Sequence, residues 1–182
     1  MREHNSEIII RHLGKTSILP DILSEFAHRQ KIVRKWVKRN DGWELLDASL
    51  LREWNSEKRI WIAEYMRQQI DRGGAALGAY CHDRLIGFCC VDGTISGKSS
   101  RYANLTMLFV DDHWKRNGIG KVLFREACIC ASAIGAEKLF ISAIPSAETI
   151  AFYQSMGCAD ANEIVEDFVD SEDDRYLEIP LQ

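Results

Sequence analysis

A stretch with phosphate-binding chemistry covers residues 105–120, where the sequence reads LTMLFVDDHWKRNGIG. An apolar strand is followed by a basic, glycine-containing turn that leads directly into a strongly helical segment. The first backbone N–H groups of a helix lack partners within the helix, and the helix dipole favours negative charge there. Lys115, Arg116 and Lys121 add cationic side chains around the same turn. The stretch therefore predicts a site for a polyphosphate group.

The spacing of this turn excludes two common nucleotide-binding loops. A Walker A loop needs a glycine five residues before Gly120 and a Ser or Thr after Lys121, and the chain has Lys115 and Val122 at those positions. A dinucleotide fingerprint needs a third glycine three residues after Gly120, where Leu123 stands. A different kind of phosphate loop is therefore needed to explain the turn.

The hexapeptide KRNGIG at residues 115–120 resembles the pyrophosphate loop of the GNAT superfamily of acetyl-CoA-dependent N-acetyltransferases. The family pattern is Arg or Gln, two variable residues, Gly, one variable residue, then Gly or Ala. Lys115 departs from this pattern, since it stands where the family has Arg or Gln. A lysine keeps the positive charge of arginine but lacks its planar guanidinium fork. An ordinary strand-to-helix turn without a ligand is the alternative interpretation.

A second motif lies 33 residues beyond Gly120, where Phe152-Tyr153 is followed by Gly157. Family members carry an aromatic pair or Leu-Tyr on a helix here, then three residues, a glycine and usually Phe. Cys158 replaces that Phe, and Ser146 stands where an Asn often contacts the cofactor. Ser146 also suits the N-cap of the predicted helix. Two motifs in the family's order strengthen the resemblance to GNAT enzymes.

The resemblance implies direct attack of a primary amine on the acetyl-CoA thioester, in which positioning supplies much of the rate. It implies an oxyanion stabilised by the backbone N–H of Phe109 or Val110, and a departing thiolate protonated by Tyr153, since a phenol with a pKa of ~10 can donate at neutral pH. Packing under the helix is the alternative role of Tyr153. The pantetheine arm is expected to pair with the strand at 102–110 where it splays from the strand at 138–144. The cofactor-binding residues implied are Leu108, Phe109, Val110, Lys115, Arg116, Asn117, Gly118, Ile119, Gly120, Lys121 and Ser146.

The motifs define less well the amine that receives the acetyl group and the general base that removes its proton. No carboxylate occurs at residues 104–107, where some relatives place a base, so a water relay or a carboxylate such as Glu163 or Glu166 is expected. The early helices carry several tryptophans, and the acidic segment 163–174 is expected in the opposite wall of the acceptor pocket; the tryptophans are Trp36, Trp43, Trp54 and Trp61. Together they would suit a cationic amine, whereas core packing and a solvated loop are the alternative.

Two interpretations of function follow from the motifs. The first is an N-acetyltransferase that moves an acetyl group from acetyl-CoA to a primary amine of a small molecule or a protein. The second is a non-catalytic acyl-CoA-binding module with the GNAT fold, which the missing strand carboxylate favours and Tyr153 disfavours. A monomer or a homodimer is expected in either case.

Size and composition fit one domain over residues 1–182, with 46% hydrophobic and 27% charged residues. The resemblance implies that this is a single N-acetyltransferase (GNAT) domain. No apolar run approaches the ~20 residues of a membrane span, and the first residues lack a signal-peptide hydrophobic region. We therefore expect a cytoplasmic protein without membrane contact. The six cysteines include no CxxC pair and no zinc-like spacing to histidine, so reduced thiols and no metal are expected.

Charge is unevenly distributed along the chain. Residues 159–182 carry nine acidic residues and one basic residue, whereas the preceding 158 residues carry 18 acidic and 22 basic residues. A nucleic-acid-binding protein would need a concentrated basic face, and the only basic cluster of the sequence is at residues 29–39. Its apolar residues have helical spacing, so we expect a solvated helix face and no nucleic-acid partner.

The elements that position these motifs follow from periodicity and turn signals. Strands are expected at residues 7–13, 75–80, 85–91, 102–110, 138–144 and 176–181, with one further strand possible in principle at 164–169. Helices are expected at residues 22–34, 56–72, 118–135 and 145–157, and a turn at 40–42. This order agrees with the fold that the resemblance implies, an α/β (α+β) GNAT fold with a mixed, mostly antiparallel sheet of six to seven strands and helices on both faces.

Overall fold

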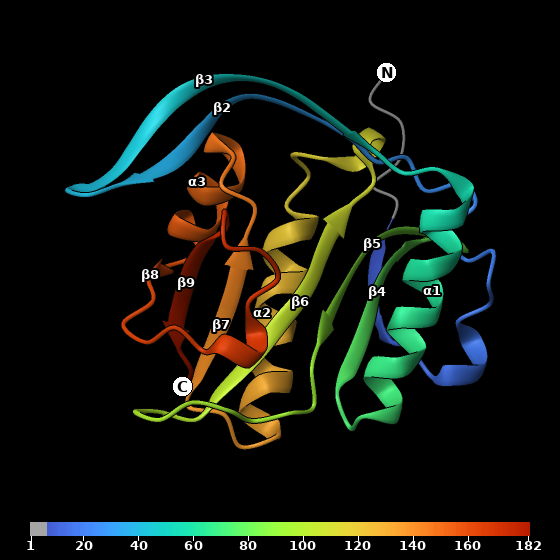
Figure 1. Cartoon of the computed structure of the whole chain (residues 1–182). Coiled ribbons are helices and arrows are strands. Elements are labelled where there is room, and N and C mark those ends of the chain that lie inside the picture. The colour runs from blue at the N-terminus through green and yellow to red at the C-terminus, as the bar shows by residue number, and fades with distance from the viewer. Residues whose placement is uncertain (1–6) are drawn as a thin grey trace.

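A seven-stranded sheet forms the centre of the molecule in the computed structural model, which describes residues 7–182 (Figure 1). The expectation of no leader segment rests partly on the first six residues, which lie outside the described part. Only β6 and β7 run parallel, and the other neighbouring strands are antiparallel. The predicted mixed, mostly antiparallel sheet is confirmed. In spatial order the strands are β1 (Ile8–His12), β4 (Ala75–Cys81), β5 (Arg84–Val91), β6 (Tyr102–Val110), β7 (Lys138–Ala143), β9 (Arg175–Pro180) and β8 (Ala159–Asp160).

Helices cover both faces of this sheet, as predicted. On one face α1 (Ser56–Asp71) buries Ile62 and Met66 against a cluster that includes Phe88 of β5. On the other face α2 (Ile119–Ala133) and α3 (Ala147–Ser155) share a second cluster with the sheet, to which α2 contributes Leu123 and Phe124. Short 3₁₀ turns η1 (Lys15–Ser17) and η2 (Asp112–Trp114) lie in the connections. Apolar burial on both faces fixes the position of the sheet.

The predicted helix at residues 22–34 is wrong, because a long hairpin of β2 (Arg29–Arg39) and β3 (Gly42–Glu53) occupies this part of the chain. The hairpin forms a separate two-stranded sheet that arches over the end of the main sheet (Figure 1). Its β-branched and aromatic residues favour a strand, and a register shift between Ile32 and Arg34 disguises the strand's alternation. The predicted turn at 40–42 is confirmed, and Gly42 has the positive φ of 133° that the turn needs.

The strand considered at residues 164–169 is also wrong. A 3₁₀ turn, η3 (Glu166–Phe168), lies there, and the additional strand of this region is the short β8. Val165 and Phe168 are buried against Tyr102 and Phe140 on the sheet. The apolar residues of this segment therefore anchor a loop to the sheet instead of pairing within it.

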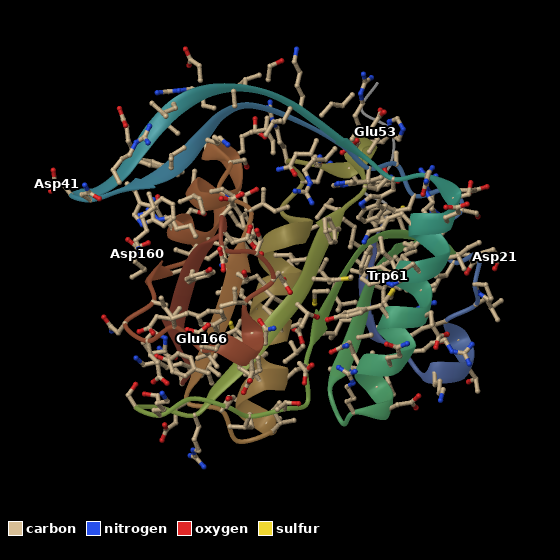
Figure 2. The ribbon with its side chains drawn as sticks, in the orientation of Figure 1. Asp21, Asp41, Glu53, Trp61, Asp160 and Glu166 are labelled. Atoms are coloured by element: carbon tan, nitrogen blue, oxygen red, sulfur yellow. The ribbon has the colours of Figure 1, made fainter. Side chains whose placement is uncertain are left out.

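The far end of the hairpin is clamped to the end of the sheet by Arg175. Its guanidinium carbon lies 5.0 Å from the ring centroids of both Trp36 and Trp43. Two of its nitrogens donate to the Asp160 carboxylate, at 2.6 and 2.9 Å, and Asp160 lies beneath the hairpin in Figure 2. The Trp36 N–H also donates to the Pro145 carbonyl oxygen at 2.7 Å. These contacts fix the far end of the hairpin over the end of the sheet.

Within residues 7–182, no helix is long and apolar enough to cross a membrane. The same residues contain no group of three or more His, Cys, Asp or Glu side chains that could hold a metal ion. The six cysteines are all free in the structure.

Candidate acetyl-transfer site

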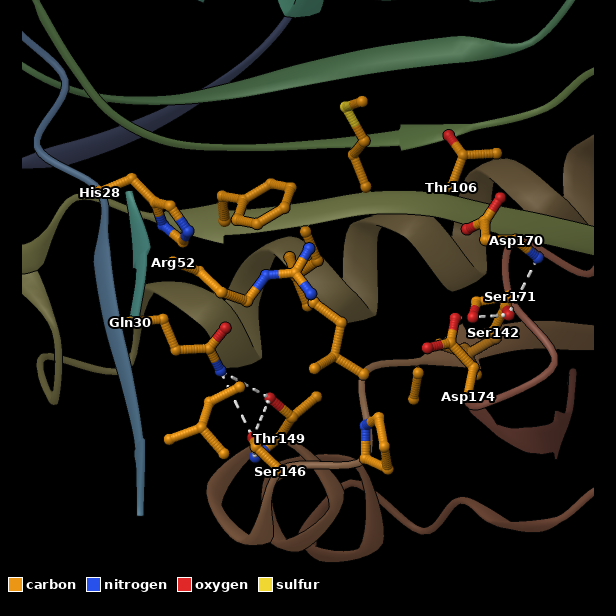
Figure 3. Close-up of a pocket in the computed structure, with 18 of the residues that line it drawn as sticks. His28, Gln30, Arg52, Thr106, Ser142, Ser146, Thr149, Asp170, Ser171 and Asp174 are labelled. Carbon is orange, nitrogen blue, oxygen red and sulfur yellow. Dashed lines mark hydrogen bonds between the residues drawn. The ribbon is translucent and has the colours of Figure 1, made fainter. Parts of the chain in front are cut away.

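A cavity of about 750 Å³ opens beneath the hairpin, between α1, the central strands and α3 (Figure 3). The strand β6 supplies its floor through residues 105–110, and residues 141–146 line the side toward α3. The hairpin, α1 and the loop at 170–174 supply the remaining walls. The cavity therefore meets both the predicted cofactor strand and the acidic C-terminal segment.

The two parallel strands separate at the mouth of this cavity. β6 pairs with β7 only from Tyr102–Asn104 to Lys138–Phe140, although β5 pairs with β6 up to Val110. One edge of β6 beyond Asn104 therefore lacks a neighbouring strand, and its backbone groups face the cavity region. An unpaired edge can accept an extended ligand as an added strand. The predicted splay is confirmed.

The loop between β6 and α2 is held by two aspartates. Asp111 is fully buried and accepts from the Ala27 N–H at 3.0 Å, the His113 N–H at 2.9 Å and the Arg84 guanidinium at 3.2 Å. Asp112 accepts from the Arg29 N–H at 2.6 Å and pairs with Lys115. These contacts join the loop to the start of the hairpin, so its backbone conformation is fixed before any ligand binds.

The first turn of α2 offers free backbone donors. Gly118 is the N-cap, with φ of 79° and no side-chain cap, and Arg116 also has a positive φ of 65°. Nothing lies within 4 Å of the position a Gly118 Cβ would take. Without a capping side chain, the first N–H groups of α2 are available to an anion. The geometry fits the pyrophosphate group implied by the sequence.

Tyr153 lies on α3 and reaches the cavity from beneath. Its side chain is buried, with the rings of Phe124 and Phe152 at 5.8 and 5.2 Å between centroids. Burial raises the pKa of Tyr153 above its usual value of 10, and nearby Cys158 and Cys89 act in the same direction. The phenol therefore keeps its proton throughout the neutral pH range and is available as a donor.

Only some of the predicted cofactor-binding residues line the cavity. Its lining includes Leu108, Phe109, Val110, Lys115, Ser146 and Tyr153. The remaining residues lie beyond its edge, in the loop and the first turn of α2, and are Arg116, Asn117, Gly118, Ile119, Gly120 and Lys121. The Ile119 side chain is buried in the core, so that residue can offer only its backbone. Ser146 caps α3 as predicted, because its hydroxyl accepts from the Thr149 N–H at 3.1 Å.

Neither Glu163 nor Glu166 lines the cavity, which corrects the expected position of the carboxylates. The Glu163 carboxylate accepts from the backbone N–H groups of Lys98 and Ser99, and Glu166 lies far from the hairpin in Figure 2. The acidic segment reaches the cavity further along the chain, through Asp170, Asp173 and Asp174. The early tryptophans divide similarly: Trp54 and Trp61 line the cavity, whereas Trp36 and Trp43 hold Arg175.

Asp174 is the most buried of these carboxylates, with a relative exposure of 9%. It accepts from the Ser142 hydroxyl at 2.8 Å, and the same hydroxyl accepts from the Asp170 N–H at 3.1 Å (Figure 3). Ser142 lies on β7, beyond its last pair with β6. Burial raises the pKa of Asp174, against smaller lowering effects of the Ser142 hydrogen bond and Arg52. A carboxylate of increased basicity thus faces the gap between the strands.

The wall opposite Asp174 contains residues that the sequence motifs did not indicate. Gln30 donates to the Ser146 hydroxyl at 3.3 Å and to the Thr149 hydroxyl at 3.2 Å. His28 stacks on Trp54, with centroids 4.2 Å apart, and its Nδ1 is buried without a hydrogen-bond partner among the described residues. Burial and then Lys115 lower the pKa of His28 to about 4. The His28 imidazole is therefore neutral at physiological pH. Because His28 and Gln30 come from the hairpin region, only the hairpin's path could have revealed them.

Comparison with known proteins agrees with this geometry. The model of the acetyltransferase (GNAT) domain matches residues 56–157, more than half of the chain. The chain belongs to the GNAT acetyltransferase family. Membership supports acetyl-CoA as the cosubstrate.

Solved structures share the fold of this GNAT protein at low sequence identity. Nourseothricin acetyltransferase has a TM-score of 0.68 and 19% identity, with 96% of this chain and 99% of that chain covered. A putative streptothricin acetyltransferase from Bacillus anthracis str. Ames, in complex with acetyl coenzyme A, has a TM-score of 0.67 and 16% identity, with 96% and 100% covered. The PaiA N-acetyltransferase from Thermoplasma acidophilum, in complex with coenzyme A, has a TM-score of 0.60 and 17% identity, with 96% and 99% covered. No curated protein sequence matches the chain.

Proposed function

We propose that this protein transfers the acetyl group of acetyl-CoA to a cationic primary amine of a small molecule or a protein, by direct attack in a ternary complex. One observation carries the proposal: the unpaired edge of β6, Tyr153 and the Asp174 carboxylate all meet in a single cavity. We also propose that the protein acts in the cytoplasm and needs no metal. It is a single domain over residues 1–182 and is either a monomer or a homodimer.

The loop and the strand would bind the donor. The backbone of residues 117–120, with Lys115, Arg116 and Lys121, takes the pyrophosphate, and the free edge at residues 108–110 pairs with the pantetheine arm. The Phe109 or Val110 N–H then donates to the oxygen that becomes negative during attack. Because Asp111 fixes the loop beforehand, these donors need little reorganisation on binding.

The opposite wall would bind the acceptor. An incoming ammonium group faces Asp174 and must lose its proton before attack, since alkylammonium groups have a pKa of ~10. Asp174 accepts that proton, directly or through a water molecule, and Tyr153 protonates the departing thiolate. Trp54 and Trp61 also line the cavity, but His28 stacks on Trp54 and the Lys58 ammonium lies 3.7 Å from the Trp61 ring centroid, so the preference for a cation comes from the acidic residues.

The test is release of CoA from acetyl-CoA in the presence of a panel of cationic, neutral and anionic amines. A thiol reagent measures CoA, and mass spectrometry identifies the acetylated product. We expect turnover of cationic primary amines. Turnover of only neutral or anionic acceptors would refute the cationic acceptor, and binding of acetyl-CoA without turnover of any amine would indicate the non-catalytic acyl-CoA-binding module instead.

A further inference from the structure

The cavity contains a cation that acetyl transfer itself does not use. Arg52 lies on β3 directly opposite Gln30 of β2, and both residues line the cavity. Figure 3 shows the Arg52 guanidinium extending into the cavity, between His28 on one side and Asp174 on the other. Arg52 remains exposed to solvent at this position, so its guanidinium is accessible to a ligand that enters the cavity.

Arg52 is not committed to a partner within the protein. Among residues 7–182 the guanidinium forms no ion pair and no hydrogen bond, although its hairpin neighbours Arg29 and Arg34 pair with Glu53 and Asp47. The charge of Arg52 lowers the pKa of Asp174, but the two side chains form no ion pair among the described residues. A guanidinium has five N–H donors in a planar fork, which matches a carboxylate in two parallel hydrogen bonds. Arg52 therefore presents an unused carboxylate-binding group inside the cavity.

Charges in the cavity are separated by wall. The acidic residues Asp170, Asp173 and Asp174 lie on the C-terminal loop. The cationic residues come from other walls: Lys35 and Arg52 from the hairpin, Lys58 from α1, and Lys115 from the loop before α2, where it pairs with Asp112. A simple polyamine would find the acidic wall favourable but would be repelled by the hairpin wall. A ligand that carries both charges would match both walls at once.

We propose that the acetyl acceptor is a basic amino acid, which carries a net positive charge, and that its carboxylate binds Arg52 while its reacting amine faces Asp174. This inference rests on the proposed acetyl transfer and specifies its acceptor. The neutral His28 ring lies beside Arg52 in the cavity wall, and its buried Nδ1 has no hydrogen-bond partner among the described residues. Arg52 acts as a specificity-determining residue and takes no part in moving protons.

The experiment compares L-lysine with L-lysinamide, which differ only by the carboxylate. CoA release is measured for both with the wild type, Arg52→Gln, Arg52→Lys and the control Arg34→Gln, whose side chain lies on the same hairpin outside the cavity lining. Because a hydrogen bond to a charged group contributes more than a neutral one, we expect Arg52→Gln to lower kcat/KM for lysine by about 10- to 100-fold. Its kcat/KM for lysinamide should be unchanged or higher, and Arg52→Lys should fall between the two.

A binding measurement keeps the outcome decisive. Calorimetric titration of the CoA-saturated protein should show tighter binding of lysine than of lysinamide, and the preference should disappear in Arg52→Gln. Equal binding and turnover of both amines by the wild type would overturn the proposal, as would equal losses in Arg52→Gln and Arg34→Gln. Turnover of lysinamide without a preference for lysine would refute only this inference. Absence of turnover with every amine would refute the proposed function, and the titration would then decide the carboxylate preference alone.

Discussion

Replacement of Tyr153 by phenylalanine separates a proton donor from a packing residue. The aromatic contacts with Phe124 and Phe152 use the ring, which phenylalanine retains, so the free energy of unfolding and the affinity for acetyl-CoA should change little. Loss of the hydroxyl removes the proposed general acid. General acids contribute about 10²- to 10⁴-fold to rate, and we expect kcat to fall within that range at pH 7.

The pH dependence provides the sharper test. Burial keeps the pKa of Tyr153 above 10, and burial also raises the pKa of the neighbouring Cys158 to about 12 and that of Cys89 above its usual value. None of these three groups should titrate between pH 6 and 9. A free thiol ionises near pH ~8.5, so protonation of the departing thiolate becomes less important as the pH rises. The defect of Tyr153→Phe should therefore shrink toward pH 9.

The assay is single-turnover release of CoA across pH 6 to 9, with thermal unfolding measured in parallel. Tyr65→Phe is the matched control, because Tyr65 lines the same cavity from α1 and stacks on Trp61 at 5.3 Å. We expect Tyr65→Phe to leave kcat nearly unchanged. A Tyr153→Phe enzyme with the wild-type kcat over the whole pH range would refute the assignment of Tyr153 as the acid.

Three further predictions concern the loop and the buried histidine. Gly118→Ala should lower the free energy of unfolding by about 1 kcal/mol, because φ of 79° disfavours a side chain. It should also raise KM for acetyl-CoA. Urea denaturation measures the first effect and steady-state kinetics the second, with Gly120→Ala as the milder control. Asp111→Ala should cost about 3 kcal/mol in urea denaturation, since three donors lose their acceptor, and an unchanged stability would contradict this. The pKa of His28 is lowered to about 4 in the folded state, so the unfolded chain binds the proton first and stability falls as pH drops from ~6.5 toward 4. After allowance for partial solvent exposure this loss is about 1 kcal/mol at pH 5, and denaturation at pH 7 and 5 should show that His28→Gln lacks it.

Local signals were sufficient to predict the strand, the turn and the helices that carry the proposed donor site. The strand at 102–110, the turn at 115–120 and the helix that follows are contiguous, so apolar patterning and glycine positions define them without long-range information. The structure places Gly118 in the left-handed conformation at the start of α2, where its type and spacing suggested it. Ser146 likewise caps α3 through a contact three residues away. Each of these features depends on neighbours in the sequence.

The acceptor half depends on contacts between distant segments. The residues Ile32, Val33, Trp36 and Val37 fit a helical face, and only pairing with β3 across the turn at 40–42 makes them a strand. An Asp-Gly turn between apolar runs favours a hairpin. Asp41-Gly42 is such a turn, and β2 and β3 pair across it. His28, Arg52 and Asp174 meet because the hairpin folds over the sheet, and no spacing rule in one segment could bring them together.

The hairpin has a consequence for how such a protein could change its substrate. The family model begins at Ser56, immediately after β3, and ends at Gly157, before the loop that carries Asp174. The donor machinery lies inside these limits, whereas His28, Arg52 and Asp174 lie outside them. The proposed donor site and the proposed acceptor site thus lie in separable parts of the chain. A hairpin with a different sequence, held by the same packing of Arg175 on Trp36 and Trp43, would change which acceptor binds. The proposed acetyl-CoA site would be unaffected.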